Sequence, residues 1–427
     1  MKSEQALRLS QITEKTLIVG VDIAKNTHWA RCQDFRGVPL SKPFRFDNTK
    51  SGIQSLELWI KKIMQGQQFE NVLVGMEPTA HYWKNLGYSL KKSGIRVVMV
   101  NTSHVHKSKE LDDNSPTKND QKDARVIAQL VKDGRYSEPN MPTGIWAEIR
   151  NLYTCRDQMM RKIDRTKKGI QNLLDRYFPE YYSVFRKLNG KASWATLKNF
   201  PFPEDIRRLT IEEIVKVWRK TILRGLGKKR AEKLIRAANN SIGIREGLDS
   251  ARWELDGLME EWDHYDKRLN ELELKLEEYI METPYGSSLL SVPGIGPVTV
   301  GGFLAETGDL KKYQHSRQIQ KLAGLNLKEN SSGNRRGMTT ISKRGRPKLR
   351  ALLYKASMLL VANNPEFKAL HHHFTHRSVR PLKGKQSLTA ICIKLIRVLF
   401  TLGKKSISYI PEKMLGEFRL NQLSLAA

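Results

Sequence analysis

The chain has 427 residues, and its 74 Lys and Arg against 44 Asp and Glu give a formal charge of +30. This excess is far beyond what solubility needs, and it predicts a polyanionic partner such as nucleic acid. No apolar h-region opens the chain, and the apolar stretch 390–402 is broken by Lys394 and Arg397, so neither export nor a membrane span is expected. Three scattered cysteines exclude a zinc ribbon or finger and suit a reducing compartment, which predicts a cytoplasmic protein.

From Thr16 to Pro139, short β-rich apolar runs alternate with helical segments. The runs are TLIVGVDIA, HWARCQDF, NVLVGME and IRVVMVN, and SGIQSLELWIKKIM is one of the helical segments between them. This alternation predicts an α/β layer with a mixed sheet, although the pattern does not fix the strand order.

Four acidic residues stand out in this region. Asp22 lies in the first apolar run, Glu77 ends a later run, and Asp120 and Asp123 are spaced i, i+3 in a segment of helical character. Burying a carboxylate in an apolar run is costly unless a divalent cation or another partner compensates. Taken singly, each acid has an ordinary explanation, such as a turn, a buried ion pair or support of a basic helix. Jointly, they predict a ribonuclease-H-like site for two Mg²⁺ ions. The nearby His28 could order that site, but packing is the favoured explanation.

Two stripes of apolar residues at spacings of three and four follow. The first has seven apolar residues between Ile149 and Tyr177 and is interrupted at Arg156 and Thr166, whereas the second runs from 255 to 279 without interruption. They predict two long coiled-coil helices, basic in the first and acidic in the second, that pair antiparallel or join two protomers. The segment 189–245 between them is a more irregular insert whose pattern does not fix its role, and an added DNA or RNA contact there stays open.

The last region opens with LLSVPGIGPVTVGGFLAETGDL. Its apolar segment, turn and second helix resemble a helix-hairpin-helix, in which glycines let backbone amides approach a phosphate, although an ordinary tight turn fits as well. Between Lys311 and Arg350, twelve basic residues stand against one acid, Glu329, which favours a nucleic-acid contact. The candidate contact residues are Gly294, Gly296, Arg335, Arg336, Lys343, Arg344, Arg346, Lys348 and Arg350.

Ser331 and Ser332 precede Gly333 in a polar loop beside these arginines. A serine hydroxyl among guanidinium groups is suited to attack phosphorus, because arginines bind the non-bridging oxygens and stabilise the charge of the transition state. On spacing alone, a flexible loop that touches phosphate without reacting is the simpler interpretation.

These motifs, taken as an ordered set, resemble the transposases, or DEDD recombinases, of the insertion sequence 110 family. The set is GVDIAK, GMEPTAHYW and NDQKDA, then PGIGPVTVGGFLAETGD, AGLNLKENSSG and SKRGRPKLRALLYKAS. The similarity covers the first 150 residues and about 110 residues from Ser287. It implies that Asp22, Glu77, Asp120 and Asp123 are metal ligands. It also implies that Ser332, with Ser331 as the fallback, is a nucleophile that becomes joined to DNA.

The expected fold is α/β plus α. The resemblance implies a RuvC-like, ribonuclease-H-type catalytic domain at 16–145 after a tail at 1–15, and a coiled-coil region at 146–285 with an insert at about 189–245. A mainly α-helical transposase domain at 286–405, with the helix-hairpin-helix-like element, precedes a tail at 406–427.

The function that the resemblance implies is RNA-guided DNA recombination by a mobile element. The expected partners are donor and target DNA, a structured non-coding bridge RNA, and further copies of the chain in a dimer or dimer of dimers, with Mg²⁺ as cofactor and no membrane. The setting would be the bacterial or archaeal cytoplasm, at the nucleoid. The absence of a GxxxxGK[ST] loop agrees with rejoining that needs no ATP.

Two alternatives stay open at this stage. One is a metal-dependent nuclease of Holliday-junction-resolving type, in which water attacks and no covalent intermediate forms. The other is a non-catalytic nucleic-acid-binding protein, in which the acids are structural.

Overall fold

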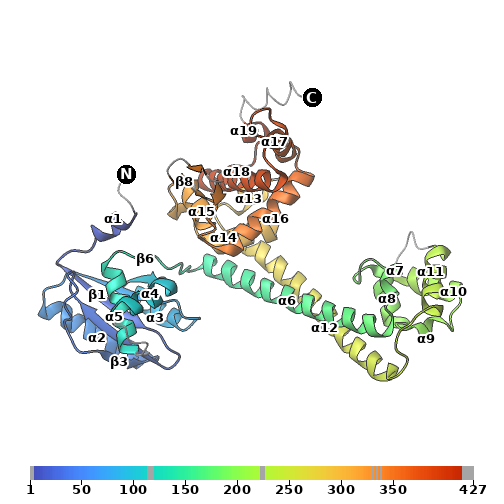
Figure 1. Cartoon of the computed structure of the whole chain (residues 1–427), viewed down its shortest axis with the longest axis horizontal. Coiled ribbons are helices and arrows are strands. Elements are labelled where there is room, and N and C mark those ends of the chain that lie inside the picture. The colour runs from blue at the N-terminus through green and yellow to red at the C-terminus, as the bar shows by residue number, and fades with distance from the viewer. Residues whose placement is uncertain are drawn as a thin grey trace. The chain divides into compact units, whose positions relative to one another are not determined.

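The computed structural model describes residues 4–112, 120–221, 227–328, 331–332, 335–336 and 339–415. The chain forms two compact units, Met1–Met141 and Pro142–Ala427, called here the N-terminal and C-terminal units (Figure 1). The elements of the N-terminal unit are α1 (Glu4–Leu9), β1 (Thr16–Asp22), β2 (Thr27–Gln33), β3 (Phe44–Asp47), α2 (Lys50–Gly66), β4 (Asn71–Met76), α3 (Trp83–Lys92), β5 (Arg96–Val100), α4 (Thr102–Asp112), α5 (Asp120–Lys132) and β6 (Tyr136–Ser137).

The N-terminal unit is built on a six-stranded sheet with the order β3-β2-β1-β4-β5-β6. Strands β1, β4 and β5 are parallel, whereas β2, β3 and β6 join the sheet antiparallel. The four apolar runs therefore form strands, and the sheet is mixed, as the sequence predicted. Helix α2 begins where the Thr49 hydroxyl accepts a hydrogen bond from the Gly52 amide.

Each face of this sheet has its own core. On one face, α2 and α3 pack against the odd-numbered residues of β1, such as Val19 and Val21. On the other, α4 and α5 pack against Ile18 and against Leu73 of β4. Because successive side chains of a strand alternate between the two faces, this assignment fixes the face on which every strand residue lies.

The C-terminal unit is mainly helical. Its elements are α6 (Ile145–Tyr177), α7 (Tyr181–Val184), α8 (Lys191–Asn199), α9 (Pro203–Ile206), α10 (Ile211–Thr221), α11 (Lys228–Asn239), α12 (Leu248–Met281), α13 (Gly286–Leu290), α14 (Pro297–Thr307), η1 (Leu310–Lys312), α15 (Ser316–Leu322), β7 (Leu327–Lys328), β8 (Ser331–Ser332), β9 (Arg335–Arg336), β10 (Thr340–Ile341), α16 (Pro347–Asn363), α17 (Pro365–His376), α18 (Gly384–Lys405) and α19 (Pro411–Leu415).

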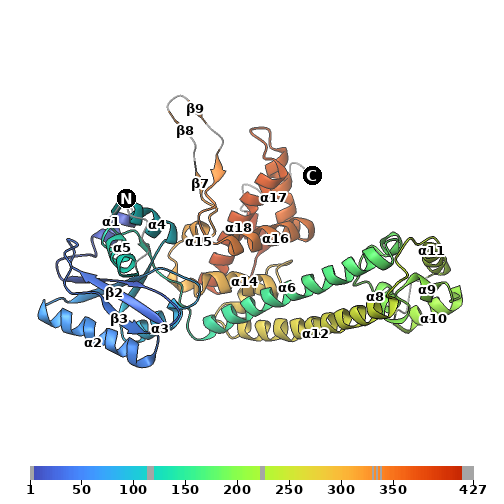
Figure 2. The same ribbon diagram turned by 60° about the horizontal axis from the view of Figure 1, so that its bottom comes forward.

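The long helices α6 and α12 pack side by side and antiparallel within one chain (Figure 2). The two polar interruptions of the first apolar stripe have partners on the second helix. Arg156 Nε donates to Glu273 at 2.6 Å, and the Thr166 hydroxyl donates to Glu261 at 3.2 Å. The basic helix is thereby held to the acidic one across the same seam that buries their apolar residues.

The segment between the long helices is better ordered than its sequence suggested. Residues 178–247, called here the tip subdomain, form the short helices α7 to α11 around a separate apolar core (Figure 2). In that core, the buried indole of Trp218 donates to the Thr196 hydroxyl at 2.9 Å. The expectation of an irregular insert was wrong because prolines and glycines separate helices that are each too short to show a clear period.

At the opposite end of the helix pair, α13 to α18 form a second helical core. Helix α14 comes close to both long helices at two glycines, which have no side chain to keep them apart. A Cβ on Gly301 would lie 2.7 Å from Leu276, and one on Gly302 would lie 2.6 Å from Tyr153. Helix α18 is long and apolar enough to cross a membrane by length and composition. It also buries Ile391, Leu395 and neighbouring residues of this core, as expected of a core helix.

Candidate active site

Asp22 and Glu77 lie side by side at the ends of two parallel strands. Val21 pairs with Met76 in the register of β1 and β4, so the residues that follow, Asp22 and Glu77, are the next neighbours. Both side chains are half-buried. Side chains two residues apart on a strand lie on the same face, so Asp22 shares the face of Gly20, and Glu77 shares that of Gly75. This is the face that α5 covers.

Helix α5 touches the backbone of this face directly. A Cβ on Gly20 would lie 2.1 Å from the carbonyl oxygen of Ala124, and one on Gly75 would lie 2.3 Å from Val131. Gly20 and Gly75 are themselves paired in register, so the helix crosses the sheet over a patch without side chains. Asp123 precedes Ala124 and is only 8% exposed. Asp123 is thus adjacent to the residue of α5 that lies over Gly20, and Gly20 is two residues before Asp22 on the same face of β1.

The chemistry of these three residues suits a hard divalent cation, because carboxylate oxygens are the ligands that Mg²⁺ prefers. Their side chains do not form a closed cage in the structure. Among the residues it describes, no three His, Cys, Asp or Glu side chains form a metal-binding group. Asp120 is the first residue of α5, but its side chain lies outside the described part of the chain. The fold thus brings Asp22, Glu77 and Asp123 to one region of the sheet.

His28 supports the loop that follows Asp22. Its imidazole is fully buried in β2, edge-to-face with Phe46, and its Nδ1 accepts a hydrogen bond from the Ala24 amide at 3.3 Å. Burial lowers the pKa of His28, which favours the neutral ring that this acceptor role requires. Packing thus accounts for His28, with the consequence that it holds the backbone two residues beyond Asp22.

Ser331 and Ser332 lie on a hairpin arm of the C-terminal unit. Strand β8 pairs with β9 in a register that sets Ser331 opposite Arg336 and Ser332 opposite Arg335, while β7 pairs with β10 (Figure 2). Residues 327–341 are called here the serine hairpin. The described part of the hairpin confirms the backbone proximity of serines and arginines, and their side chains lie outside the description.

The base of the serine hairpin is anchored by short contacts. The amides of Ser342, Lys343 and Arg346 donate to the carbonyls of Asn326, Gly324 and Leu322 at 2.7, 3.0 and 2.7 Å. A Cβ on Gly324 would lie 2.9 Å from the Lys343 carbonyl carbon, and Gly324 has a φ of +68°, so glycine is required there.

Two transposase models match the chain over the regions just described. A DEDD transposase model of the IS110 type covers residues 19–179, which include all four predicted acids. The model of the transposase IS116/IS110/IS902 family covers residues 286–372, which include both serines. The chain belongs to the IS110/IS116 family of transposases. It is therefore an enzyme of the transposase class.

Individual relatives agree with this family. The insertion element IS116 uncharacterized 44.8 kDa protein of Streptomyces clavuligerus is 24% identical over 92% of this chain and 96% of its own length. The pilin gene-inverting protein of Moraxella bovis is 20% identical over 91% of this chain and 96% of its own length. A probable family 20 transposase of Pseudomonas aeruginosa is 30% identical over 36% of this chain and 46% of its own length.

Several predicted nucleic-acid contacts of this transposase also have internal partners. Arg350 Nη1 donates to the carbonyls of Ala323 at 2.9 Å and Lys343 at 3.3 Å, and Lys348 pairs with Asp157 at 2.8 Å. Arg346 donates to the Glu306 carbonyl and lies 3.3 Å from its carboxylate. Arg350 thus holds the hairpin base, and Lys348 and Arg346 are paired with α6 and α14, which leaves the exposed Lys343 and Arg344 as the more accessible of the predicted contacts.

The glycine turn between α13 and α14 is braced by α16. Gly294 has a φ of +91°, and the Asn364 side chain at the end of α16 donates to the Pro293 carbonyl at 3.1 Å. Gly294 and Gly296 are both exposed. The turn is therefore accessible, as a phosphate contact would require.

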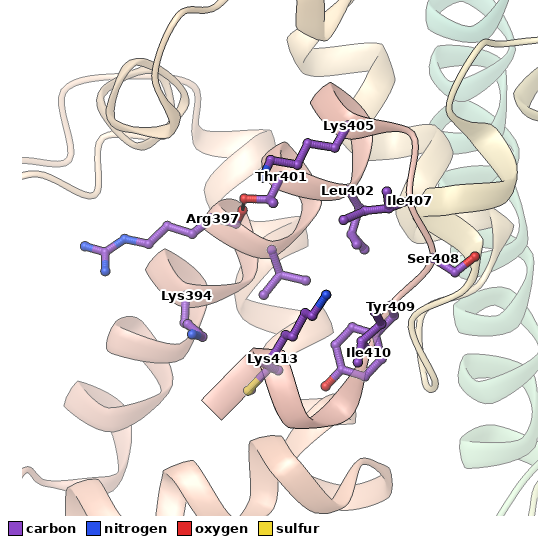
Figure 3. Close-up of a pocket in the computed structure, with 12 residues that line it drawn as sticks. Lys394, Arg397, Thr401, Leu402, Lys405, Ile407, Ser408, Tyr409, Ile410 and Lys413 are labelled. Atoms are coloured by element: carbon purple, nitrogen blue, oxygen red, sulfur yellow. Dashed lines mark hydrogen bonds between the residues drawn. The ribbon is translucent and has the colours of Figure 1, made fainter. Parts of the chain in front are cut away.

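A hollow of about 260 Å³ lies between α18 and α19 of the transposase (Figure 3). Its walls are partly apolar, with Val398 and Leu402 among them, and four cations line it, namely Lys394, Arg397, Lys405 and Lys413. None of the predicted acids or serines is among the described residues that line this hollow.

Proposed function

We propose that this transposase is an RNA-guided DNA recombinase that cuts and rejoins DNA through a serine-linked intermediate. The observation that carries the proposal is the pairing of Asp22 and Glu77 at the ends of β1 and β4, on the face that α5 covers. Asp123 lies on that covering helix, in a chain whose family comprises transposases.

In this proposal, Asp22, Glu77, Asp120 and Asp123 hold one or two Mg²⁺ ions. The chemistry that Mg²⁺ supplies when bound is neutralisation of charge on the scissile phosphodiester. The chain itself contributes the fixed position of the acids, because Gly20 and Gly75 leave no space through which α5 could shift toward the sheet.

The nucleophile in this proposal is Ser332. Its Oγ forms a bond to phosphorus while the bond from phosphorus to one deoxyribose oxygen breaks, and the serine proton is transferred to that leaving oxygen. Arg335 and Arg336 would bind the non-bridging oxygens and stabilise the added charge. The phosphoserine ester conserves the energy of the broken linkage, so the reverse attack by a deoxyribose hydroxyl rejoins DNA without ATP.

The proposed partners are donor DNA, target DNA and a structured guide RNA. The charge of +30 is spread over a protein with no evident base-reading motif, which supports recognition of nucleic-acid shape and backbone more than bases. Base pairing by an RNA would then supply the choice of sequence. A structured non-coding segment beside the gene, with loops that match the element's ends and its target, is the expected genomic sign.

Assembly of the active site from more than one chain is part of the proposal. The acids belong to the N-terminal unit and the serines to the C-terminal unit, and α6 begins close to the boundary between them. We propose that the helix pair α6 and α12 acts as a coiled-coil element in a dimer or dimer of dimers, so that cleavage depends on pairing of protomers.

Trapping of the intermediate tests the serine step. The protein is allowed to react with DNA that carries the ends of the mobile element and is then denatured. We expect a covalent protein–DNA adduct to remain. Ser332→Ala should abolish this adduct, and Ser331→Ala should retain it. Cleavage without any adduct would indicate a water-dependent nuclease instead, and an adduct lost only in Ser331→Ala would move the nucleophile by one residue.

The acids are tested separately. Asp22→Asn combined with Glu77→Gln should reduce strand cleavage by about a thousandfold or more while DNA binding survives, because charge stabilisation at phosphorus is lost. Recombination at the wild-type rate would mean that the acids are structural and that catalysis lies elsewhere.

A further inference from the structure

The tip subdomain contains a strongly basic cleft that the proposed active site does not use. The cleft has a volume of about 860 Å³ and lies between the segment 182–193 and the start of α11. None of its lining residues is acidic, and six of them are exposed cations: Arg186, Lys187, Lys191, Lys229, Arg230 and Lys233. Cations from two distant segments thus converge on one concave surface.

The acids of the tip subdomain do not neutralise this cleft. Six of its seven acids are engaged in caps and ion pairs with other residues, and the seventh, Glu246, does not line the cleft. In the part of the chain that the structure describes, no ion pair involves any of the six cations. The engaged acids and their partners are Glu180 with Ser241, Glu204 with Arg207, Asp205 with Arg252, Glu212 with Lys228, Glu213 with Thr210 and Glu232 with Arg236. The cleft therefore keeps an excess of positive charge.

Two helices begin at this cleft. Helix α8 follows Gly190 and helix α11 follows Gly227, and neither glycine supplies a side chain to cap the first amides. The first turns of both helices, at Lys191 and at Lys229, line the cleft. The positive ends of two helix dipoles add to the six cations, a combination that binds phosphate.

Helix α6 carries further exposed cations, interspersed with the exposed Asp164. Arg161, Lys162, Arg165, Lys167 and Lys168 are all exposed on this helix, and three of them line a second hollow of about 620 Å³. With 33 residues, α6 is about 50 Å long, which matches roughly 15 base pairs of duplex. A long, stiff polyanion fits such a track better than a single phosphate does.

The lining of the cleft favours a duplex over an unpaired strand. Its two aromatic residues, Tyr182 and Phe185, are half-buried and buried, so neither offers a free ring face on which an unpaired base could stack. Contacts here would be to phosphates, which any sequence provides.

We propose that the tip subdomain binds the phosphate backbone of duplex DNA that flanks the cleaved site. This inference rests on the proposed function, in which DNA is the substrate, and adds a contact outside the region of the acids and serines. The tip would act as a sequence-independent clamp on the DNA held along α6.

The test measures binding of the full chain to a labelled duplex of about 40 base pairs, longer than α6 can span. The cleft variant is Lys187→Gln, Lys191→Gln and Lys229→Gln. A matched control, Arg208→Gln, Lys216→Gln and Lys220→Gln, removes the same charge from exposed residues of the same subdomain that do not line the cleft. Unchanged thermal unfolding and unchanged intrinsic tryptophan fluorescence show that each variant is folded.

The cleft variant should bind DNA about tenfold or more weakly at moderate salt. The slope of log K against log salt should fall by about 2.7, which corresponds to three lost phosphate contacts, whereas the control should change little. Equal losses in both variants, or no loss in the cleft variant, would overturn the proposal.

A double-stranded RNA of equal length separates the two possible sources of phosphate. A loss of affinity at least as large for DNA as for RNA supports the clamp, and a larger loss for RNA would replace it with a guide-RNA site. Adduct formation at Ser332 is measured separately, so failure of the clamp and failure of the proposed reaction are distinguishable.

Discussion

The acidic end of the sheet and the serine hairpin are built in opposite ways. At the sheet, α5 lies in backbone contact with Gly20, and the acids extend from strands paired on both sides. The serines lie on a two-residue strand of an arm whose described anchoring contacts are at its base. The first region suits ligands that must keep their positions, and the second suits a nucleophile that must reach its phosphate.

The largest loss of stability and activity is expected when a side chain is added at Gly20, where α5 contacts β1. Gly20→Ala would place a methyl group 2.1 Å from the Ala124 carbonyl oxygen, so the helix must move. We expect a loss of about 3 kcal/mol in unfolding free energy and of most cleavage activity, measured by thermal unfolding and by a cleavage assay. Gly66→Ala is the control, because nothing lies within 4 Å of its added Cβ. Equal stability of the two variants would mean that α5 is not held rigidly.

A smaller effect is expected at the base of the serine hairpin. Arg350→Lys keeps the charge, but its shorter side chain does not place a donor where Nη1 of Arg350 bonds the carbonyls of Ala323 and Lys343. We expect about 1–2 kcal/mol of destabilisation and faster proteolysis within the hairpin, measured by thermal unfolding and limited digestion. Arg344→Lys, at an exposed neighbour, should leave both unchanged. Equal resistance of the hairpin to proteolysis in both variants would mean that Arg350 does not anchor it.

The acidic end should also respond to pH through His28. Burial lowers the pKa of His28 below its usual value of about 6.5, so the unfolded chain binds this proton more readily. The stabilisation is therefore full above about pH 6.5 and is lost as the pH falls below it, by at most about 1.4 kcal/mol per pH unit. Unfolding measured from pH 8 to pH 5 should show a weaker dependence in His28→Gln. The same slope in both proteins would assign it to other groups.

The smallest effect concerns the helix pair that carries the arm. A double-mutant cycle on Arg156 and Glu273, whose side chains are 18% and 31% exposed, should give a coupling of about 0.5–1 kcal/mol. The exposed pair Lys198 and Asp263 should give almost none. A larger coupling at the exposed pair would contradict the role assigned to burial.

The sequence predicted the local elements better than their arrangement. Apolar runs located the strands that carry Asp22 and Glu77, and the regular stripes located α6 and α12. Strand order, and with it the adjacency of Asp22 and Glu77, depends on contacts between distant segments that a local pattern does not contain. The family resemblance, not the spacing, pointed to Ser332.

The cleft of the tip subdomain also depends on contacts between distant segments that a local sequence pattern does not contain. Its cations occur in two short groups, at 186–191 and 229–233, that look like ordinary basic surface until α8 and α11 fold together. Gly190 and Gly227, each just before a helix, were the available signal, because an uncapped helix start beside several cations suits an anion. The arginines of the hairpin base show the reverse error, since a basic cluster in sequence included residues with internal carbonyl and carboxylate partners.

Metal affinity tests the central claim most directly, namely that the sheet acids hold the metal and the hairpin supplies the nucleophile. Mg²⁺ binding to the full chain can be measured by calorimetry for the wild type, for Asp22→Asn with Glu77→Gln, and for Ser332→Ala. We predict that the acid variant loses the site, whereas Ser332→Ala binds Mg²⁺ as the wild type does. Unchanged affinity in the acid variant would contradict the account.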